Sequence, residues 1–288
     1  MLHLEPLAPA LAAEVHDVDL SVALSEETVA ALRQAWLEHL VLVFRDQQLS
    51  DAALVAFSRR FGELDTVLGW EPYSPDGFPE VLTISNVTQG EAAIGVLGDG
   101  EAAWHTDMSY LDRPPPASLL HSLETPAEGG DTFFMSMYAA LDEMPAELRA
   151  EIAGKFLNHD ASYDSSGKLR STHDPVRDVS RAPGARHPII AKHPETGRPA
   201  LYLGRRLNAY VVGQDVADSE VLLDRLWAHC DQEKFIYRHR WQPGDMVMWD
   251  NRCAMHRRNP FDPNARRIMH RTQIKGDAPV VAYGSSLR

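Results

Sequence analysis

The stretch Trp104-His105-Thr106-Asp107 decides how the fold of this 288-residue sequence is interpreted. We expect it to lie in a strand, where residues two apart point to the same face, so the side chains of His105 and Asp107 can converge on one point. A third ligand should come from a distant strand, and the candidate is His256, which follows the β-type run 246–252. Two histidines and one carboxylate leave three positions of an octahedral metal open, an arrangement used by ferrous enzymes that activate oxygen. On spacing alone the signal is weak, because most His-x-Asp pairs are surface residues.

Residues further along the chain suit a metal site that also binds an organic acid. Arg267 begins a predicted strand, 267–274, in which alternate residues from Arg267 to Gln273 share one face. An arginine on the metal-facing side can hold a carboxylate through two parallel hydrogen bonds, and the hydroxyl of Thr132 can donate to the same carboxylate. Alternatively, Arg267 is an exposed, salt-bridged residue and Thr132 a plain β-former. The residues expected to pack beneath the ligands or to fix the turn before His256 are Trp249, Asp250, Asn251 and Arg252.

Short runs of β-forming residues, separated by Gly and Pro turns, surround these motifs and are typical of an antiparallel sandwich. The predicted strands cover residues 40–44, 81–85, 118–123, 132–135, 188–191, 201–203, 235–241, 246–249 and 267–274.

Four amphipathic helices are expected beside the strands. Ser25 opens the first with a capping pattern. Ser50 opens the second, which Gly62 can end in the left-handed conformation. Two more are expected at 139–152 and 219–230.

The segment 154–187 lacks sustained periodicity and is long for a connection in a compact domain, which indicates a lid or a mobile segment. It carries six Lys and Arg against four Asp, and residues 252–271 carry six Arg against one Asp. A basic mouth over the site would attract anionic ligands. The same charges would also suit ordinary solvated surface or a contact between subunits.

Composition limits the classes of partner. The 28 Lys and Arg against 41 Asp and Glu give a formal charge of −13, which disfavours nucleic acid and anionic membranes and favours a small-molecule substrate. No apolar run approaches the roughly 20 residues of a membrane span, and the N-terminus lacks a secretory signal. We therefore expect one cytoplasmic domain, 1–288, with Cys230 and Cys253 as reduced thiols.

The four motifs, taken together in this order, resemble the taurine and chlorophenoxyacetate dioxygenases, the TauD/TfdA family. They are W-H-T-D (104–107), G-G-D-T (129–132), W-D-N-R-x-x-x-H (249–256) and R-R-I-M-H-R (266–271). The resemblance extends over nearly the whole chain. It implies a mainly β fold with α, a double-stranded β-helix (jelly-roll, cupin-like) core with flanking helices and the lid insertion at 154–187. It also implies a homo-oligomer, either a dimer or a tetramer.

Carried over residue by residue, the resemblance makes His105, Asp107 and His256 the ligands of Fe(II). It makes Thr132 and Arg267 the partners of the distal carboxylate of 2-oxoglutarate. The implied reaction uses O2 to convert 2-oxoglutarate into succinate and CO2 while a substrate is hydroxylated.

The resemblance points less sharply to the substrate. Arg271 occupies the position that contacts the substrate's anionic group in the taurine enzyme, or it is a second cosubstrate or structural arginine. Glu101 occupies the position where the taurine enzyme has an amide side chain. Its carboxylate either binds an amine or hydroxyl group of the substrate, or Glu101 is simply part of a polar turn. Trp70 and Tyr73 either line the pocket or staple their loop to the core. The expected substrate is a small polar, anionic molecule: a sulfonate, an aryloxyalkanoate, a sulfate ester or an amino-acid-like compound.

Two other functions stay open. A metal hydrolase or isomerase could use the same three ligands, although it needs no cosubstrate clamp such as Arg267. A non-catalytic ligand-binding homologue could keep the scaffold, although the complete ligand triad argues against it.

Overall fold

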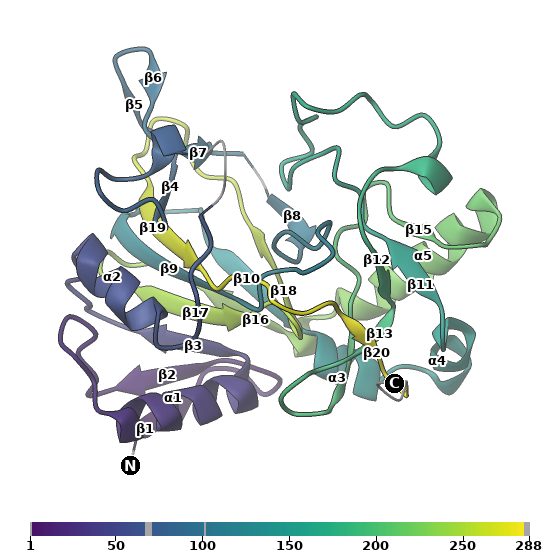
Figure 1. Cartoon of the computed structure of the whole chain (residues 1–288), viewed down its shortest axis with the longest axis horizontal. Helices are drawn as coiled ribbons and strands as arrows, with labels where there is room; N and C mark the ends of the chain where they lie inside the picture. The colour runs from purple at the N-terminus through teal and green to yellow at the C-terminus, as the bar shows by residue number, and fades with distance from the viewer. Residues whose placement is uncertain (1, 67–70, 101, 285–288) are drawn as a thin grey trace.

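The computed structural model describes residues 2–66, 71–100 and 102–284 and is mainly β with several helices (Figure 1). The large sheet has the strand order β1 (His3–Pro6), β2 (Ala13–His16), β3 (Val41–Phe44), β17 (Met246–Asp250), β9 (Ala117–Glu124), β19 (Ile268–Gln273), β4 (Leu82–Ser85) and β7 (Val96–Leu97). The smaller sheet has the order β16 (Ile236–His239), β10 (Thr132–Ser136), β18 (Ala254–Arg258) and β8 (Ala102–His105).

The described chain also contains short strands outside these two sheets. They are β5 (Thr88–Gln89), β6 (Ala92–Ala93), β11 (Phe156–Asn158), β12 (Arg186–Pro188), β13 (Ile190–Lys192), β14 (Pro199–Leu201), β15 (Tyr210–Val211) and β20 (Val281–Ala282). The α-helices are α1 (Glu26–His39), α2 (Asp51–Ser58), α3 (Met137–Asp142), α4 (Ala146–Ile152) and α5 (Val216–Cys230). The 3-10 helices are η1 (Glu71–Tyr73), η2 (Val179–Arg181) and η3 (Glu233–Phe235).

Both faces of the central strands of the large sheet, β3 and β17, are buried, and strand alternation divides their side chains between two cores. In β17, Met246 and Met248 join an outer cluster with Trp36 of α1. Val247 and Trp249 point the other way and join an inner cluster, which includes Phe134 of β10. The inner cluster therefore joins the two sheets. Since the strands alternate with period two, residues that share the inner face can also line a cavity between the sheets.

The first two helices begin where the sequence predicts. Ser25 Oγ accepts a hydrogen bond from the backbone of α1, and Ser50 Oγ does the same for α2. The predicted end of the second helix is wrong, because α2 stops at Ser58 and Gly62 is not in the left-handed region. Gly62 is needed for packing instead, since a Cβ there would lie 2.6 Å from Cγ2 of Ile274.

Other predicted boundaries also need correction. The helix expected at 139–152 is two helices, α3 and α4, because Pro145 disfavours the helical conformation of the residue before it. The strand expected at 188–191 is divided between β12 and β13. The backbone of Ile189 is the reason, since it pairs with Lys155 on one side and Tyr202 on the other.

The segment 154–187 begins with β11 and contains η2, and most of the rest has no regular structure. Cys230 and Cys253 are both buried and free. Within the described residues, no helix is both long enough and apolar enough to cross a membrane.

Candidate metal centre

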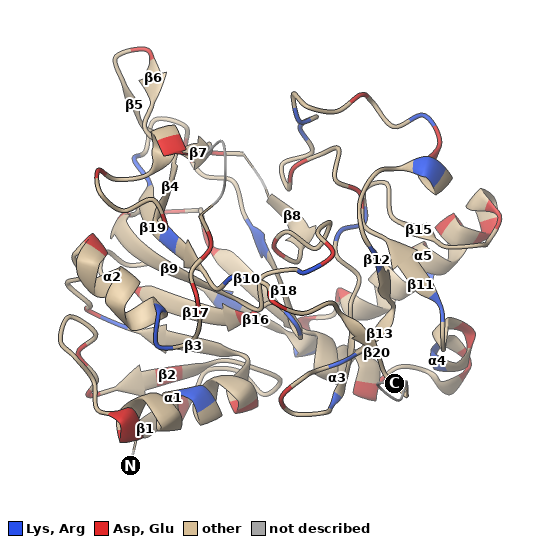
Figure 2. Cartoon of the chain, viewed as in Figure 1, with Lys and Arg blue, Asp and Glu red and all other residues tan. Residues whose placement is uncertain are grey.

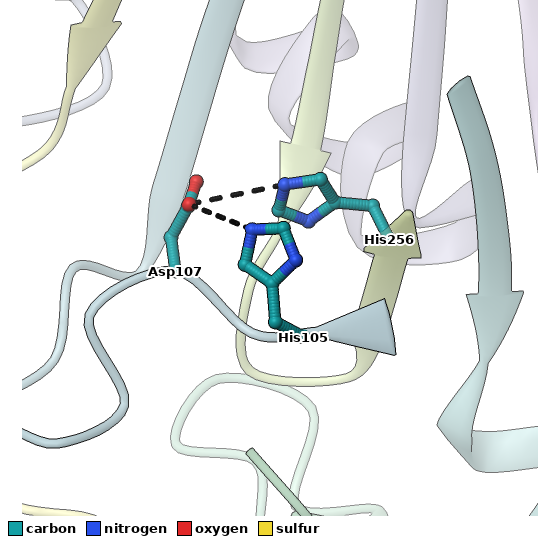
Figure 3. A group of neighbouring side chains, drawn as sticks. All are labelled: His105, Asp107 and His256. Carbon is teal, nitrogen blue, oxygen red and sulfur yellow. Dashed lines mark ion pairs between the residues drawn. The ribbon is translucent and has the colours of Figure 1, made fainter. Parts of the chain in front are cut away.

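The residues of the W-H-T-D motif do not all lie in a strand. β8 ends at His105, and Asp107 lies two residues beyond it in a turn, so the predicted strand through Asp107 is wrong. The chain leaves the sheet because Thr106 donates its backbone N–H to Gly204 and Met108 has a positive φ of 47°. The turn nevertheless directs the carboxylate of Asp107 back towards the imidazole of His105 (Figure 3).

His256 reaches the same place from β18, where it lies directly opposite His105 in the antiparallel pair. Asp107 Oδ1 lies 3.7 Å from Nε2 of His105 and 3.8 Å from Nε2 of His256. One ligand atom from each residue lies within 4.8 Å of the others, and all three residues are buried. Two atoms that each lie about 2.1 Å from one ion are at most about 4.2 Å apart, and both distances from Asp107 Oδ1 are shorter than this.

The protonation of these groups suits a divalent metal. His105 donates Nδ1–H to the carbonyl of Ala103 over 2.7 Å, which leaves the lone pair on Nε2 directed at the site. Burial and the neighbouring His105 lower the pKa of His256 to about 3, so its ring is neutral. Burial acts to raise the pKa of the Asp107 carboxyl, but His256, Arg271 and His105 together lower it by more. The net effect is a pKa well below the usual range, so the carboxyl group is ionised. Two imidazoles and one carboxylate form a donor set suited to first-row transition metals.

A network of buried hydrogen bonds orients the carboxylate of Asp107. Ser118 Oγ donates to Asp107 Oδ2 over 2.7 Å and accepts from the side-chain amides of Asn251 (3.0 Å) and Gln273 (3.1 Å). Trp249 donates its indole N–H to Asn251 Oδ1, and its ring packs 4.8 Å from that of His256. The network leaves Asp107 Oδ1 directed at the two imidazoles.

The three residues of the triad open into a cavity, which Thr132, Arg267 and Arg271 also line. Arg267, directly before β19, and Arg271, within it, both line this cavity. Sequence positions more than 150 residues apart therefore share one cavity.

This geometry agrees with the comparisons with known proteins. The model of the taurine catabolism dioxygenase TauD, TfdA family matches residues 3–273. The chain belongs to this family. An alpha-ketoglutarate-dependent 2,4-dichlorophenoxyacetate dioxygenase of Cupriavidus pinatubonensis is 36% identical over 283 residues, covering 96% of this chain and 98% of that protein. An alpha-ketoglutarate-dependent sulfate ester dioxygenase of Pseudomonas putida is 31% identical, with 100% and 94% covered.

Solved structures of the family are similarly close. A taurine dioxygenase from Burkholderia xenovorans superposes with a TM-score of 0.80 at 32% identity, covering 99% of this chain and 94% of that one. AAD-2, solved in complex with Mn(II) and N-oxalylglycine, also gives 0.80 at 29% identity, with 98% and 100% covered. The protein is thus a TauD/TfdA-type dioxygenase with a jelly-roll fold, whose reaction uses 2-oxoglutarate (alpha-ketoglutarate), dioxygen and a metal ion.

One corner of the dioxygenase's cavity fits the distal carboxylate of 2-oxoglutarate. Arg267 is only 2% exposed, and its Nε has no hydrogen-bond partner among the described residues. Thr132 Oγ1 accepts the indole N–H of Trp241 over 2.9 Å, so its own proton can be donated to a ligand. A guanidinium with an unpaired N–H beside a hydroxyl donor is a suitable place for a carboxylate.

Among the candidate substrate residues of the dioxygenase, Arg271 lines the cavity and Tyr73 does not. Arg271 is 8% exposed, and its Nη1 lies 3.5 Å from Asp107 Oδ1 while its Nη2 donates to Gln273. Tyr73, in η1, is partly buried and packs against the inner core, and it does not line the cavity. Trp70 and Glu101 lie outside the described residues.

The sequence interpretation missed three residues at this site. Ser118 belongs to no motif and gave no signal beyond a place in a predicted strand. Gln273 shares a predicted face with Arg271, and Arg258 lies two residues after His256 in a β-type run, so strand alternation could have identified both. Arg258 lines the same cavity as the triad.

A second cluster of potential ligands in the described chain is filled by an arginine. His193, Asp250 and Cys253 are buried together, but Arg252 donates to the Asp250 carboxylate from its backbone N–H, Nε and Nη2 over 2.7–2.9 Å. A guanidinium in this position satisfies the carboxylate and repels a cation. The cluster therefore fixes the turn that precedes His256, as the sequence predicts for Asp250 and Arg252.

Proposed function

We propose that this dioxygenase uses Fe(II) and hydroxylates a small anionic organic molecule, within one domain that spans residues 1–288. The observation that carries the proposal is the placement of two buried guanidinium groups beside the metal triad, that of Arg267 directly before β19 and that of Arg271 within it. Four residues along a strand correspond to about 13 Å between Cα atoms. That separation lets one arginine bind the cosubstrate and the other bind a second anion.

Each residue then has a distinct task. His105, Asp107 and His256 would hold the metal. When bound, Fe(II) and 2-oxoglutarate would supply, together with O2, the oxidising chemistry that hydroxylates the substrate, with release of succinate and CO2. Arg267 and Thr132 fix the distal carboxylate, so the 2-oxo acid end faces the triad.

Arg271 positions the substrate through its anionic group. Its contacts with Asp107 and Gln273 keep the guanidinium close to the metal triad and restrict its rotamers. The names of several relatives are consistent with an anionic substrate, since they include 2,4-dichlorophenoxyacetate, (S)-phenoxypropionate and sulfate esters. We infer the same broad class for this chain: an aryloxyalkanoate, a sulfonate, a sulfate ester or an amino-acid-like acid.

We also infer that the segment 154–187 acts as a lid over this site. Ser165 lines the cavity, and its carbonyl accepts the backbone N–H of Ala103 in β8. Arg205 holds the same part of the segment by donating from Nη1 to the carbonyl of Tyr163. Both Lys or Arg residues and Asp residues lie along the segment (Figure 2), which carries six Lys and Arg against four Asp. A basic lid would attract an anionic substrate.

The test is an anaerobic titration of the full chain with Fe(II) and 2-oxoglutarate. The bound pair should give a weak visible absorption band, and an anionic substrate should shift that band when it binds nearby. Matched acids and their neutral amides or esters are then screened. The proposal requires that acids perturb the band and their neutral counterparts do not. If no acid in the four classes perturbs it, the anionic-substrate assignment is wrong.

A further inference from the structure

Arg258 lies on the same strand and the same face as a residue of the metal triad. It follows His256 by two positions in β18, and alternate residues of a strand share a face about 7 Å apart. In the antiparallel pair with β10, Arg258 lies directly opposite Thr132. Directly opposed residues have Cβ atoms about 5 Å apart. Arg258 therefore extends from beside Thr132 into the cavity that holds the triad and Arg267.

The cavity consequently contains two buried guanidinium groups in one corner. Arg258 is 7% exposed and Arg267 is 2% exposed. Burial lowers the pKa of Arg267, and the positive charge of Arg258 lowers it further, which reflects how close the two groups are. No carboxylate of the described residues forms an ion pair with Arg267. A buried guanidinium such as that of Arg267, with no carboxylate partner of its own, is costly unless a ligand brings a negative charge beside it.

Contacts with neighbouring residues hold Arg258 in this orientation. Its Nη2 donates to the carbonyl of Gly100, at the end of the loop before β8, and the guanidinium lies over the ring of Phe261, 5.4 Å from its centroid. The side chain is thus restricted before any ligand arrives.

We propose that Arg258 is a cosubstrate-binding residue that contacts the distal carboxylate of 2-oxoglutarate together with Arg267 and Thr132. The inference rests on the roles of Arg267 and Thr132 in the proposed function. A carboxylate between two guanidinium groups neutralises both and receives charge-assisted hydrogen bonds from each. Arg258 would then determine specificity for a dicarboxylic 2-oxo acid over a monocarboxylic one.

The neighbouring arginine provides a matched control. Arg257 points to the opposite face of β18, where its guanidinium lies 3.9 Å from the ring centroid of Phe133. Its Nη1 donates to Asn259 rather than to any residue that lines the cavity. Arg257→Gln therefore removes the same charge from the same strand without changing the cosubstrate corner.

The experiment compares two ligands in Mn(II)-loaded protein without oxygen by isothermal titration calorimetry. 2-Oxoglutarate carries the distal carboxylate, and 2-oxopentanoate has the same chain length without it. We expect Arg258→Gln to weaken the binding of 2-oxoglutarate by about 10- to 100-fold. The affinity for 2-oxopentanoate should change less than about threefold. Arg257→Gln should alter neither affinity. Equal weakening of both ligands, or no weakening, would overturn the proposal.

Two further variants separate the possible failures. Arg258→Lys keeps the charge but loses the bidentate hydrogen-bonding geometry of the guanidinium. Its preference for 2-oxoglutarate over 2-oxopentanoate should fall between those of wild type and Arg258→Gln. If Arg258→Gln does not fold, the preference measured for Arg258→Lys decides, and an unchanged value contradicts the proposal. Arg267→Ala is titrated in parallel. If it loses 2-oxoglutarate while the Arg258 variants do not, only the Arg258 inference fails. If neither position matters, the cosubstrate assignment in the proposed function fails as well.

Discussion

Ser118 Oγ lies 2.7 Å from Asp107 Oδ2, so a residue near the start of β9 holds the only carboxylate of the metal triad. The hydroxyl has one proton, which it gives to Asp107, and it accepts from both Asn251 and Gln273. Its hydrogen-bonding capacity is therefore fully used. Because Oδ2 is fixed in this way, Oδ1 stays directed at His105 and His256.

Ser118→Ala should weaken metal binding without removing any ligand. The carboxylate loses its orienting donor, and outer-shell losses of this kind typically cost 10- to 100-fold in metal affinity. The measurement is the Kd for Mn(II), followed by electron paramagnetic resonance of the free ion. Ser122→Ala is the control, since Ser122 is also buried in β9 but donates to the backbone of Gln242. Equal Mn(II) affinities in the two variants would contradict the orienting role.

Arg267→Ala should raise the KM for 2-oxoglutarate by about 10- to 100-fold, because a buried charge-assisted hydrogen-bond donor is lost. Succinate formation at varied 2-oxoglutarate is the readout. Arg266→Ala is the control, because Arg266 is exposed and pairs with Glu124 outside the cavity. An unchanged KM in Arg267→Ala would mean that Arg267 does not bind the distal carboxylate of 2-oxoglutarate.

Arg271→Gln should weaken substrate binding and leave the binding of 2-oxoglutarate nearly unchanged. Glutamine keeps a hydrogen-bond donor but removes the charge that attracts an anionic group, so we expect the substrate Kd to rise about 10-fold or more. The affinity for 2-oxoglutarate should change less than about threefold. Both values come from the anaerobic absorption titration. A selective loss of 2-oxoglutarate would instead assign Arg271 to the cosubstrate.

Strand alternation accounts for much of what the sequence predicted correctly. Placing Arg267 and Arg271 on one face of a strand agrees with the structure, in which Arg267 directly precedes β19, Arg271 lies within it and both line the cavity. The prediction of the ligand triad depended on sequence motifs rather than on hydrophobic periodicity. Asp107 lies outside any strand, and its position results from a turn that pairs with Gly204, which no local pattern reveals.

What the sequence could not predict depends on contacts between distant segments. Ser118 becomes important only because β17 and β19 bring Asn251 and Gln273 to it. Gly62 gave a misleading signal, because its small size serves a close approach to Ile274 rather than the end of a helix. The division at Pro145, by contrast, was visible in the sequence, and proline's effect on the preceding residue should have separated α3 from α4.

The stability of the metal-free protein should fall as pH decreases below about 6.5. His159 is buried, and neither ring nitrogen has a hydrogen-bond partner among the described residues. Burial, with His187 and Arg205 nearby, holds the pKa of His159 well below its usual range. Burial also lowers the pKa of His187 and of His239. In the unfolded chain each imidazole titrates near 6.5.

The sign follows from proton binding. Below pH 6.5 the unfolded state binds protons that the folded state does not bind. Each such histidine therefore lowers the free energy of unfolding by up to about 1.4 kcal/mol for each unit that the pH falls, until the pKa of the histidine in the folded state is reached. Urea unfolding at pH 7.5, 6.5 and 5.5 in the presence of a chelator measures this slope. His159→Gln should be less stable than wild type at pH 7.5, because it loses the ring stacked on Tyr202, yet it should have a shallower slope below pH 6.5. An unchanged slope in this variant would mean that His159 is protonated equally in both states.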